Sequence, residues 1–223
     1  MPARPYQVSN RQLAVNHAGL ANMLSYQEMK ALKELKNDIE LAITRGSAIS
    51  GTTTVAPQTA GFLNKLVTYF TSSSGTTLTE KVFNDILTLS YSTPAKIREV
   101  YGNMQVKRTI NGFVGGTTTK YVMANDKRLA AVIDTYESQM GVQAIFLSRY
   151  QLQAASVGAQ GNSWMAIDPD KFNIAWLIPP KTETLGLDGD RQRKFVHCEF
   201  GLLARSEKGG VGATGHVANI VST

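Results

Sequence analysis

The clearest hydrophobic pattern lies in residues 25–46, where apolar side chains recur at the three- and four-residue spacing of a helix. These are Met29, Leu32, Leu35, Ile39, Ala42 and Ile43, and the opposite face carries Lys30, Glu34, Lys36, Asp38 and Glu40. Ser25 and Glu28 have the spacing of a capping box, and Gly46 is placed to end the helix in the left-handed conformation. The pattern predicts one rod of roughly 30 Å against which a sheet packs.

Shorter helical patterns follow this rod. Residues 59–70 place apolar side chains on one face, and a second helix is expected after Thr77, which has the capping-box spacing with Glu80. Thr93-Pro94 resembles a helix cap with a first-turn proline, and we expect this short helix to end at Gly102. The first half of the chain is therefore predicted to be mainly helical.

The second half has strand-like segments between glycines and polar turns. They cover residues 104–110, 119–124, 128–136, 142–150, 164–167, 172–178, 193–205 and 216–222. Two antiparallel hairpins are expected, one at 128–150 turning at Ser138 to Gly141, and one at 164–178 that ends at Pro179-Pro180. Helices first and paired strands later predict an α+β fold.

Composition narrows the class of protein. The 223 residues are 43% hydrophobic and 18% charged, as in folded domains, and no apolar run approaches the ~20 residues of a membrane span. A single cysteine, Cys198, excludes an internal disulfide and fits a reducing cytoplasm. The net charge of +6 is scattered, and its densest cluster is Arg191, Arg193 and Lys194. The sequence has no recognisable element for contacting bases, which disfavours a sequence-specific nucleic-acid binder. Non-specific electrostatic contact with a polyanion is compatible with the charge.

The candidate catalytic motifs have simpler explanations. Residues 210–215 spell G-V-G-A-T-G, but only eight residues follow, so we expect a hairpin loop in place of a dinucleotide site. His197, Cys198 and Glu199 are adjacent, yet alternation along a strand turns Cys198 away from the other two. We expect Cys198 to be a small core residue.

Metal sites have equally little support. His17 and His216 are isolated, and the two Asp-x-Asp pairs lack the glutamate that completes a calcium loop. These pairs, Asp168 with Asp170 and Asp188 with Asp190, suit turns. The sequence predicts no catalytic, cofactor or metal residues, and no enzyme.

Several segments, in order, resemble the tailed-bacteriophage major capsid (major head) protein family. They are residues 9–46 around the predicted rod, AAVIDTYESQMGVQAIFLSRY at 130–150, and the stretch from IDPDKFNIAWLIPP at 167 to HVANI at 220. The resemblance implies the Hong Kong 97-type fold, with a long spine helix and a long antiparallel hairpin in a P domain, plus a mixed α/β A domain. It implies P-domain residues 1–50 and 115–152, with the hairpin at 128–150, and A-domain residues 51–114 and 153–223.

The resemblance also implies a function, namely self-assembly into an icosahedral shell around double-stranded DNA. Partners would be further copies in pentamers and hexamers, and portal, scaffold or decoration proteins, with non-specific DNA proximity and no membrane. Such a protein would be found in the virion and be assembled in the host cytoplasm. The alternatives are an encapsulin-type shell and an accessory virion or adhesin module.

For subunit contacts, we expect acidic residues of the spine to meet a basic loop of the next copy. The residues are Glu34, Asp38, Glu40, Arg191, Arg193 and Lys194. The family has an N-terminal arm and an E-loop ahead of the spine, whereas 24 residues precede it here. The expectation is a fragment, a processed form or a different way of clasping neighbours, so no E-loop contact or cross-link residue is transferred.

Overall fold

The computed structural model describes residues 2–15, 19, 22–66, 68–72, 75–92, 95–113, 135–152, 161–186 and 189–216. The chain forms two compact units. Unit 1 comprises Met1–Asn64 and Ile174–Leu203, and unit 2 comprises Lys65–Asn173 and Ala204–Thr223.

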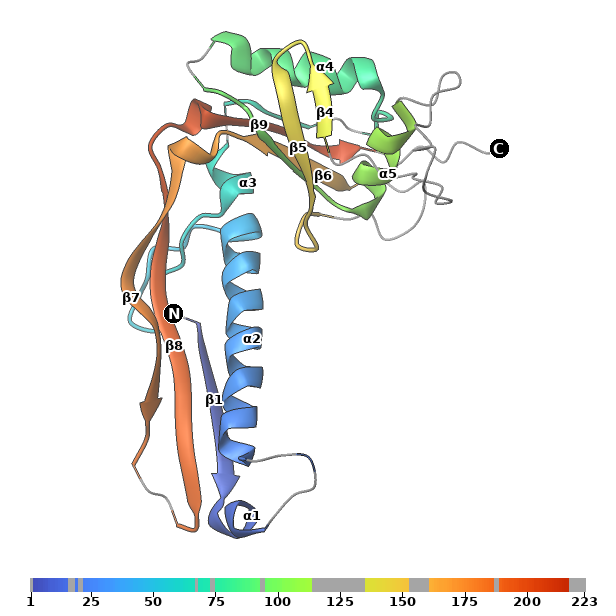
Figure 1. The fold of residues 1–223 in the computed structure, drawn as a ribbon. Helices are drawn as coiled ribbons and strands as arrows, with labels where there is room; N and C mark the ends of the chain where they lie inside the picture. The colour runs from blue at the N-terminus through green and yellow to red at the C-terminus, as the bar shows by residue number, and fades with distance from the viewer. Residues whose placement is uncertain are drawn as a thin grey trace. The chain divides into compact units, whose positions relative to one another are not determined.

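Unit 1 combines one long helix with a three-stranded sheet. Helix α2 spans Met23–Arg45, and the sheet has the order β1-β8-β7, with β1 at Ala3–Ser9, β8 at Arg191–Ala204 and β7 at Phe172–Thr184. Figure 1 shows β1 and β8 running alongside α2. The short helix α1 (Asn10–Ala14) lies between β1 and α2 in the sequence, and the short helix α3 (Phe62–Lys65) follows α2.

The predicted rod exists, but both of its ends differ in detail from the prediction. The cap is Asn22, whose Oδ1 accepts hydrogen bonds from the amides of Leu24 (2.9 Å) and Ser25 (3.4 Å), so the helix begins ahead of the expected Ser25 box. Gly46 ends the helix at φ −53°, outside the left-handed region. Glycine is required there for space, because a Cβ would lie 2.7 Å from the carbonyl oxygen of Thr59.

The alternation along β8 decides which side chains face α2. Val196 and Cys198 form a buried cluster with Ala31 and Leu35 of the helix, joined by Tyr6, Ile39 and Phe200. Only part of the predicted apolar stripe is buried against the sheet. Met29 and Leu32, which belong to the stripe, are 54% and 41% exposed. Within unit 1, the buried stripe of α2 is therefore narrower than its apolar pattern.

Unit 2 is a six-stranded mixed sheet with helices. The strand order is β2-β9-β6-β3-β5-β4, in which β2 pairs with β9, and β3 with β5, in parallel, while the other neighbours are antiparallel. The strands are β2 (Phe70–Ser72), β9 (Gly210–His216), β6 (Asn162–Ile167), β3 (Glu99–Gly102), β5 (Gly141–Leu147) and β4 (Thr135–Ser138). Its helices are α4 (Glu80–Thr88) and α5 (Met104–Phe113), with short 3-10 turns η1 (Leu89–Ser92), η3 (Pro169–Lys171) and η4 (Glu207–Gly209).

An aromatic cluster forms the core of unit 2. Phe83 of α4 is fully buried, and its ring centroid lies 4.6 Å from Trp164, 5.5 Å from Tyr136 and 5.9 Å from Phe113. Because these residues come from the two helices α4 and α5 and from the two strands β4 and β6, the cluster fixes both helices on the sheet.

Several predicted elements of unit 2 are wrong. Residues 104–110, predicted as a strand, form helix α5, because Asn103 caps it by accepting a 2.8 Å hydrogen bond from the amide of Val106. Residues 99–102 are strand β3 instead of the end of a helix, and the cap of α4 is Thr79, not Thr77. The helical pattern at 59–70 yields only α3.

The glycine-rich motif at 210–215 is also not a loop. It forms most of strand β9, which is largely buried. A Cβ at Gly212 would lie 2.7 Å from the carbonyl oxygen of Trp164 and 2.9 Å from the ring of Phe70. Glycine here allows β9 to pack closely against its neighbours. The motif therefore has a structural explanation that involves no dinucleotide. Of the last predicted strand, 216–222, all but His216 lies outside the described residues.

The hairpin turn from Ser138 to Gly141 is confirmed, since β4 and β5 pair across it and Gly141 adopts φ +104°. The described part of residues 115–152 lies in unit 2, whose sheet contains β4 and β5, whereas α2 lies in the unit that contains β1 and most of β7 and β8. Residues 119–124 and 128–134 lie outside the described part of the chain.

The expected hairpin at 164–178 does not form. Strand β6 pairs with β3 and β9, whereas β7 continues into the other sheet beside β8. Pro179 and Pro180 lie inside β7 and do not end it. β7 is an edge strand, and there a proline whose missing amide would face the open side removes no ladder hydrogen bond.

Candidate functional site

The surface of unit 1 is the candidate functional site, and polar contacts hold its elements together. Arg4 of β1 donates from Nε and Nη2 to the two carboxylate oxygens of Asp38 on α2, each at 2.7 Å. Arg4 also lies 3.9 Å from Glu34. Hydrogen bonding and the charge of Asp38 raise the pKa of Arg4. This two-bond pair fixes the register of β1 along the helix.

A second polar contact joins α2 to the opposite edge of the sheet. The hydroxyl of Thr182 on β7 donates a 2.8 Å hydrogen bond to Oε1 of Glu28. Tyr6 of β1 is near the same carboxylate, and burial together with Glu28 raises the pKa of Tyr6 to about 12. Glu28 therefore bonds the helix to the edge strand β7 and influences the titration of Tyr6 on β1.

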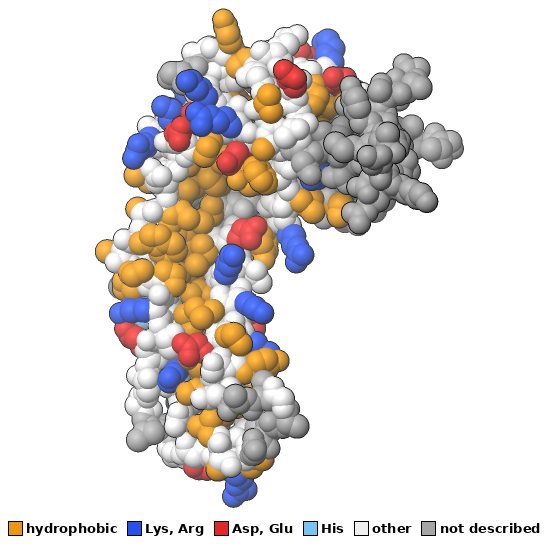
Figure 2. Space-filling model, in the orientation of Figure 1, with side chains coloured by type: hydrophobic (Ala, Val, Ile, Leu, Met, Phe, Trp, Pro, Cys, Tyr) orange, Lys and Arg blue, Asp and Glu red, His pale blue; other side chains and the backbone are white. Residues whose placement is uncertain are grey.

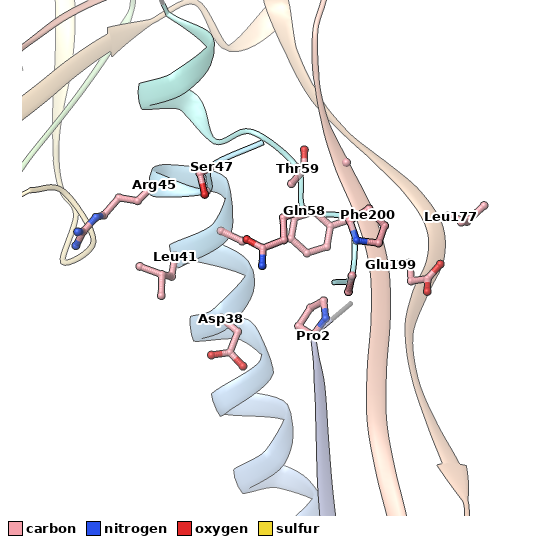
Figure 3. A pocket seen from close by; sticks show the side chains of 15 residues that line it. Pro2, Asp38, Leu41, Arg45, Ser47, Gln58, Thr59, Leu177, Glu199 and Phe200 are labelled. Carbon is pink, nitrogen blue, oxygen red and sulfur yellow. The ribbon is translucent and has the colours of Figure 1, made fainter. Parts of the chain in front are cut away.

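Near the C-terminal end of α2, unit 1 contains an apolar groove of about 1170 Å³. Figure 3 shows the side chains that line it, which come from α2, from the loop after it and from β8, with Pro2 and Leu177 beside them. Its lining includes Leu41, Pro57, Leu177 and Phe200, and its charged members are Asp38, Arg45 and Glu199. Leu177 is 79% exposed, and Figure 2 shows hydrophobic side chains gathered over this part of the unit. Exposed apolar surface of this kind is typical of protein–protein contacts.

The structure places all six predicted contact residues in unit 1. Glu34 and Glu40 are exposed on α2, whereas Asp38 is held by Arg4. Arg191, Arg193 and Lys194 are not in a loop as expected, because they begin strand β8. Arg191 donates to the Gln7 side chain at 3.4 Å. The two groups of opposite charge thus belong to separate elements of one unit.

The arrangement around Cys198 does not provide a nucleophile with a base. Cys198 is buried against α2, and this burial raises the pKa of its thiol. His197 lies on the other face of β8, where its ring stacks on Phe195 at 4.6 Å and its Nε2 is 3.9 Å from Glu183. The predicted separation of the two side chains is confirmed.

The first of the two aspartate pairs forms the turn that the sequence predicts. Asp168 Oδ1 accepts a 3.2 Å hydrogen bond from the amide of Asp170, which is an Asx turn. Asp188 lies outside the described residues.

Among described residues, no group of three or more His, Cys, Asp and Glu side chains is arranged to hold a metal ion. None of the described helices is both long and apolar enough to cross a membrane.

Sequence reasoning missed the groove and the Arg4–Asp38 pair. The groove is lined by segments around residues 41, 57 and 200, which are far apart in the sequence. No local pattern of residues indicates that they meet. Arg4 lies in a polar N-terminal segment, and its partner is 34 residues away. The exposed Leu177 resembled a core position because it lies in a continuous apolar run, Ile174 to Ile178.

The sequence model of the SU10 major capsid protein family matches residues 3–215, nearly the entire chain. The chain belongs to the SU10 major capsid protein family. No curated protein sequence matches this capsid protein.

Solved structures show the same fold. The similar chains include an encapsulin complex of Synechococcus elongatus, with a TM-score of 0.68 at 8% identity, covering 100% of this chain and 75% of that one. The capsid of an empty GTA particle gives 0.63 at 11% identity, covering 97% and 73%. The capsid of Myoviridae phage XM1 gives 0.59 at 17% identity, covering 96% and 72%.

These matches confirm the predicted resemblance to tailed-phage major capsid proteins of the Hong Kong 97-type fold. The fold is a mixed α+β capsid fold. This capsid protein is a structural subunit of a multimeric virion shell, and its family and fold are those of a structural protein and not of an enzyme. Its functional surfaces are therefore its contacts with other subunits.

Proposed function

We propose that this capsid protein tiles a closed icosahedral shell around double-stranded DNA, with copies in pentamers and hexamers assembled in the host cytoplasm. The observation that carries the proposal is the family match over residues 3–215, combined with the capsid fold of the similar structures. Contacts inside such rings are heterologous, so one patch of the chain meets a different patch on the next copy.

We further propose that α2 is the spine helix and that unit 1 corresponds to the P domain and unit 2 to the A domain. The support is that α2 is the longest helix among the described residues and that the longest strands, β7 and β8, belong to the same unit. This assignment replaces the hairpin at 128–150 by β7 and β8 as the long P-domain strand pair.

For the contacts between copies, Glu34 and Glu40 of one copy would approach Arg191, Arg193 and Lys194 of the next. The exposure of the two glutamates supports this pairing. Asp38 would contribute through Arg4, because its carboxylate is engaged within the subunit. The charges on α2 and at the start of β8 have opposite signs, which suits a heterologous contact.

A charge-reversal series tests the pairing. Glu40→Arg and Arg191→Glu are each expected to reduce the yield of closed shells, and the double variant to recover part of it. Lys81→Glu, on an exposed position of α4, is the control and is expected to assemble normally. Full assembly of both single variants, each with a normal thermal unfolding midpoint, would argue against these residues.

Enclosure of DNA has its own test. Purified particles are treated with nuclease and then opened, and the proposal expects protected double-stranded DNA together with portal, scaffold or decoration proteins. An encapsulin-type shell is the second candidate, favoured by the TM-score of 0.68 with the encapsulin chain. It would yield protein cargo without protected DNA. The accessory or adhesin alternative is not pursued, because the family match covers nearly the entire chain.

A further inference from the structure

Five basic side chains that are dispersed in sequence gather at one edge of unit 2. They project from the segment before β3, from the turn after β6, and from the turn between β8 and β9. The residues are Lys96, Arg98, Lys171, Arg205 and Lys208, called here the basic edge. Figure 2 shows Lys and Arg side chains gathered over the region where Figure 1 draws the start of β7 and the end of β8.

Backbone hydrogen bonds bring these three segments together. The amide of Arg98 donates to the carbonyl of Ile167 at 3.3 Å, and the amide of Arg205 donates to the carbonyl of Lys171 at 2.9 Å. The amide of Asp168 donates to the carbonyl of Gly209 at 2.8 Å. The basic edge is thus a property of the fold, which explains why the sequence reads as scattered charge.

The buried side chain of Asp168 holds backbone segments of the basic edge in place. Its side chain is 2% exposed, and its two oxygens accept hydrogen bonds from the amides of Asp170 (3.2 Å) and Lys96 (3.0 Å). Asp170 faces Arg98 at 3.5 Å. The five cations of the basic edge outnumber the carboxylates of the same segments, Asp168, Asp170 and Glu207, so the edge carries a net positive charge.

The composition of the edge favours a particular kind of partner. Protein–protein contacts have an apolar core, whereas surfaces that contact a nucleic-acid backbone are polar and strongly positive. None of the large exposed hydrophobic side chains comes from residues 95–98, 168–171 or 205–208. No helix or strand of the described part of unit 2 presents these cations as a reading element, so base-specific contact is not implied.

We propose that the basic edge binds the phosphate backbone of double-stranded DNA without sequence preference, and so marks the part of unit 2 that faces the shell interior. The inference rests on the proposed function, because it requires DNA inside the shell. Flexible lysine and arginine side chains suit this role, since phosphates passing an inner wall have no fixed register.

The test measures DNA affinity of the unassembled full chain as a function of salt. A labelled random-sequence duplex is titrated with wild-type protein and with the variant Lys96→Ala/Arg205→Ala/Lys208→Ala. The control is Lys30→Ala/Lys33→Ala/Lys36→Ala on the exposed side of α2, which removes the same charge. Thermal unfolding of both variants verifies that each is folded.

Each phosphate contact contributes about −0.9 to the slope of log K against log[salt], so the edge variant is expected to flatten the slope by about 2 to 3, with the control unchanged. An equal loss in both variants would mean that binding follows net charge alone and would overturn the proposal. So would an edge variant that binds DNA normally but fails to form shells, which would indicate a contact with another copy.

A second readout separates this inference from the proposed function. In DNA-filled particles, Lys96 and Lys208 are expected to be protected from amine-labelling reagents and to become reactive once the DNA has been released. Equal labelling in both states, in particles that do contain DNA, overturns the basic edge while leaving the DNA shell intact. Particles that never contain DNA overturn the proposed function itself.

Discussion

Arg4 and Asp38 form a two-bond ion pair between the first strand and the long helix of unit 1, with both nitrogen–oxygen distances at 2.7 Å. The pair joins residues 34 positions apart and fixes β1 beside α2. It also means that Asp38, a predicted contact residue, already has a partner inside the subunit. The N-terminal strand is therefore part of the folded unit and not a loose arm.

Asp38→Asn is expected to loosen β1, because an amide cannot accept both guanidinium hydrogen bonds. Hydrogen exchange of the β1 amides, which pair with β8, should become several-fold faster while the β6 amides remain unchanged. Glu40→Gln, which removes an exposed charge on the same helix, is the control. Equal exchange in the two variants would show that the ion pair does not hold the strand.

Leu35→Ala is expected to lower the free energy of unfolding by about 2–5 kcal/mol, because it opens a cavity between α2 and the sheet. Leu35 is 1% exposed and contacts the cluster around Val196 and Cys198. Leu32→Ala makes the same chemical change at a 41% exposed position and should remain within about 0.5 kcal/mol of wild type. Chemical denaturation measures both, and similar losses would contradict the packing described for α2.

Gly212→Ala is expected to destabilise unit 2 by about 1–3 kcal/mol through overpacking. The new methyl group would lie 2.7 Å from the carbonyl oxygen of Trp164, which is backbone and cannot move aside cheaply. Gly112→Ala is the matched change in open space within α5, and it should stabilise by up to about 1 kcal/mol. The reverse order of stability in thermal unfolding would rule out the close strand packing at β9.

Acidification is expected to weaken unit 2 through His216. Burial lowers the pKa of His216, and a hydrogen bond to the carbonyl of Thr76 opposes this in part. Since the unfolded chain then binds the proton more readily, stability is full above the unfolded pKa of about 6.5 and falls as the pH drops toward the folded pKa. Urea unfolding across this range should show the loss, and His216→Gln should reduce it. An unchanged pH dependence in the variant would assign the effect to other groups.

The sequence was most informative where one segment contains its own signals. The length of α2, the strand at β8 and the turn at Gly141 all follow from local periodicity or from a single glycine. The side chains of His197 and Cys198 lie on opposite faces of β8, and this follows from the alternation of side chains along a strand alone. These features require no knowledge of distant partners.

Errors arose where a distant contact decides the outcome. Residues 104–110 alternate well enough for a strand, and only the cap at Asn103 together with burial of Val106 and Ile110 against the sheet favours a helix. The glycines of β9 resemble a loop until Trp164 is brought against them. The hairpin expected at 164–178 was wrong because β6 and β7, though adjacent in sequence, belong to different sheets.

The candidate surfaces were predictable only in part. Exposed glutamates on α2 were found from their helical face, whereas the groove and the basic edge combine residues from separate segments. For the basic edge, individual hydrogen bonds between separate segments bring Lys96, Lys171 and Arg205 together. No spacing in the sequence encodes that proximity.

Electron microscopy of the purified protein, alone and with its virion partners, tests the central claim most directly. The account predicts rings and closed shells built from many copies, with density for α2 and for the strands β7 and β8 in every subunit. A chain that stays monomeric at high concentration, and forms neither rings nor shells with those partners present, would contradict it.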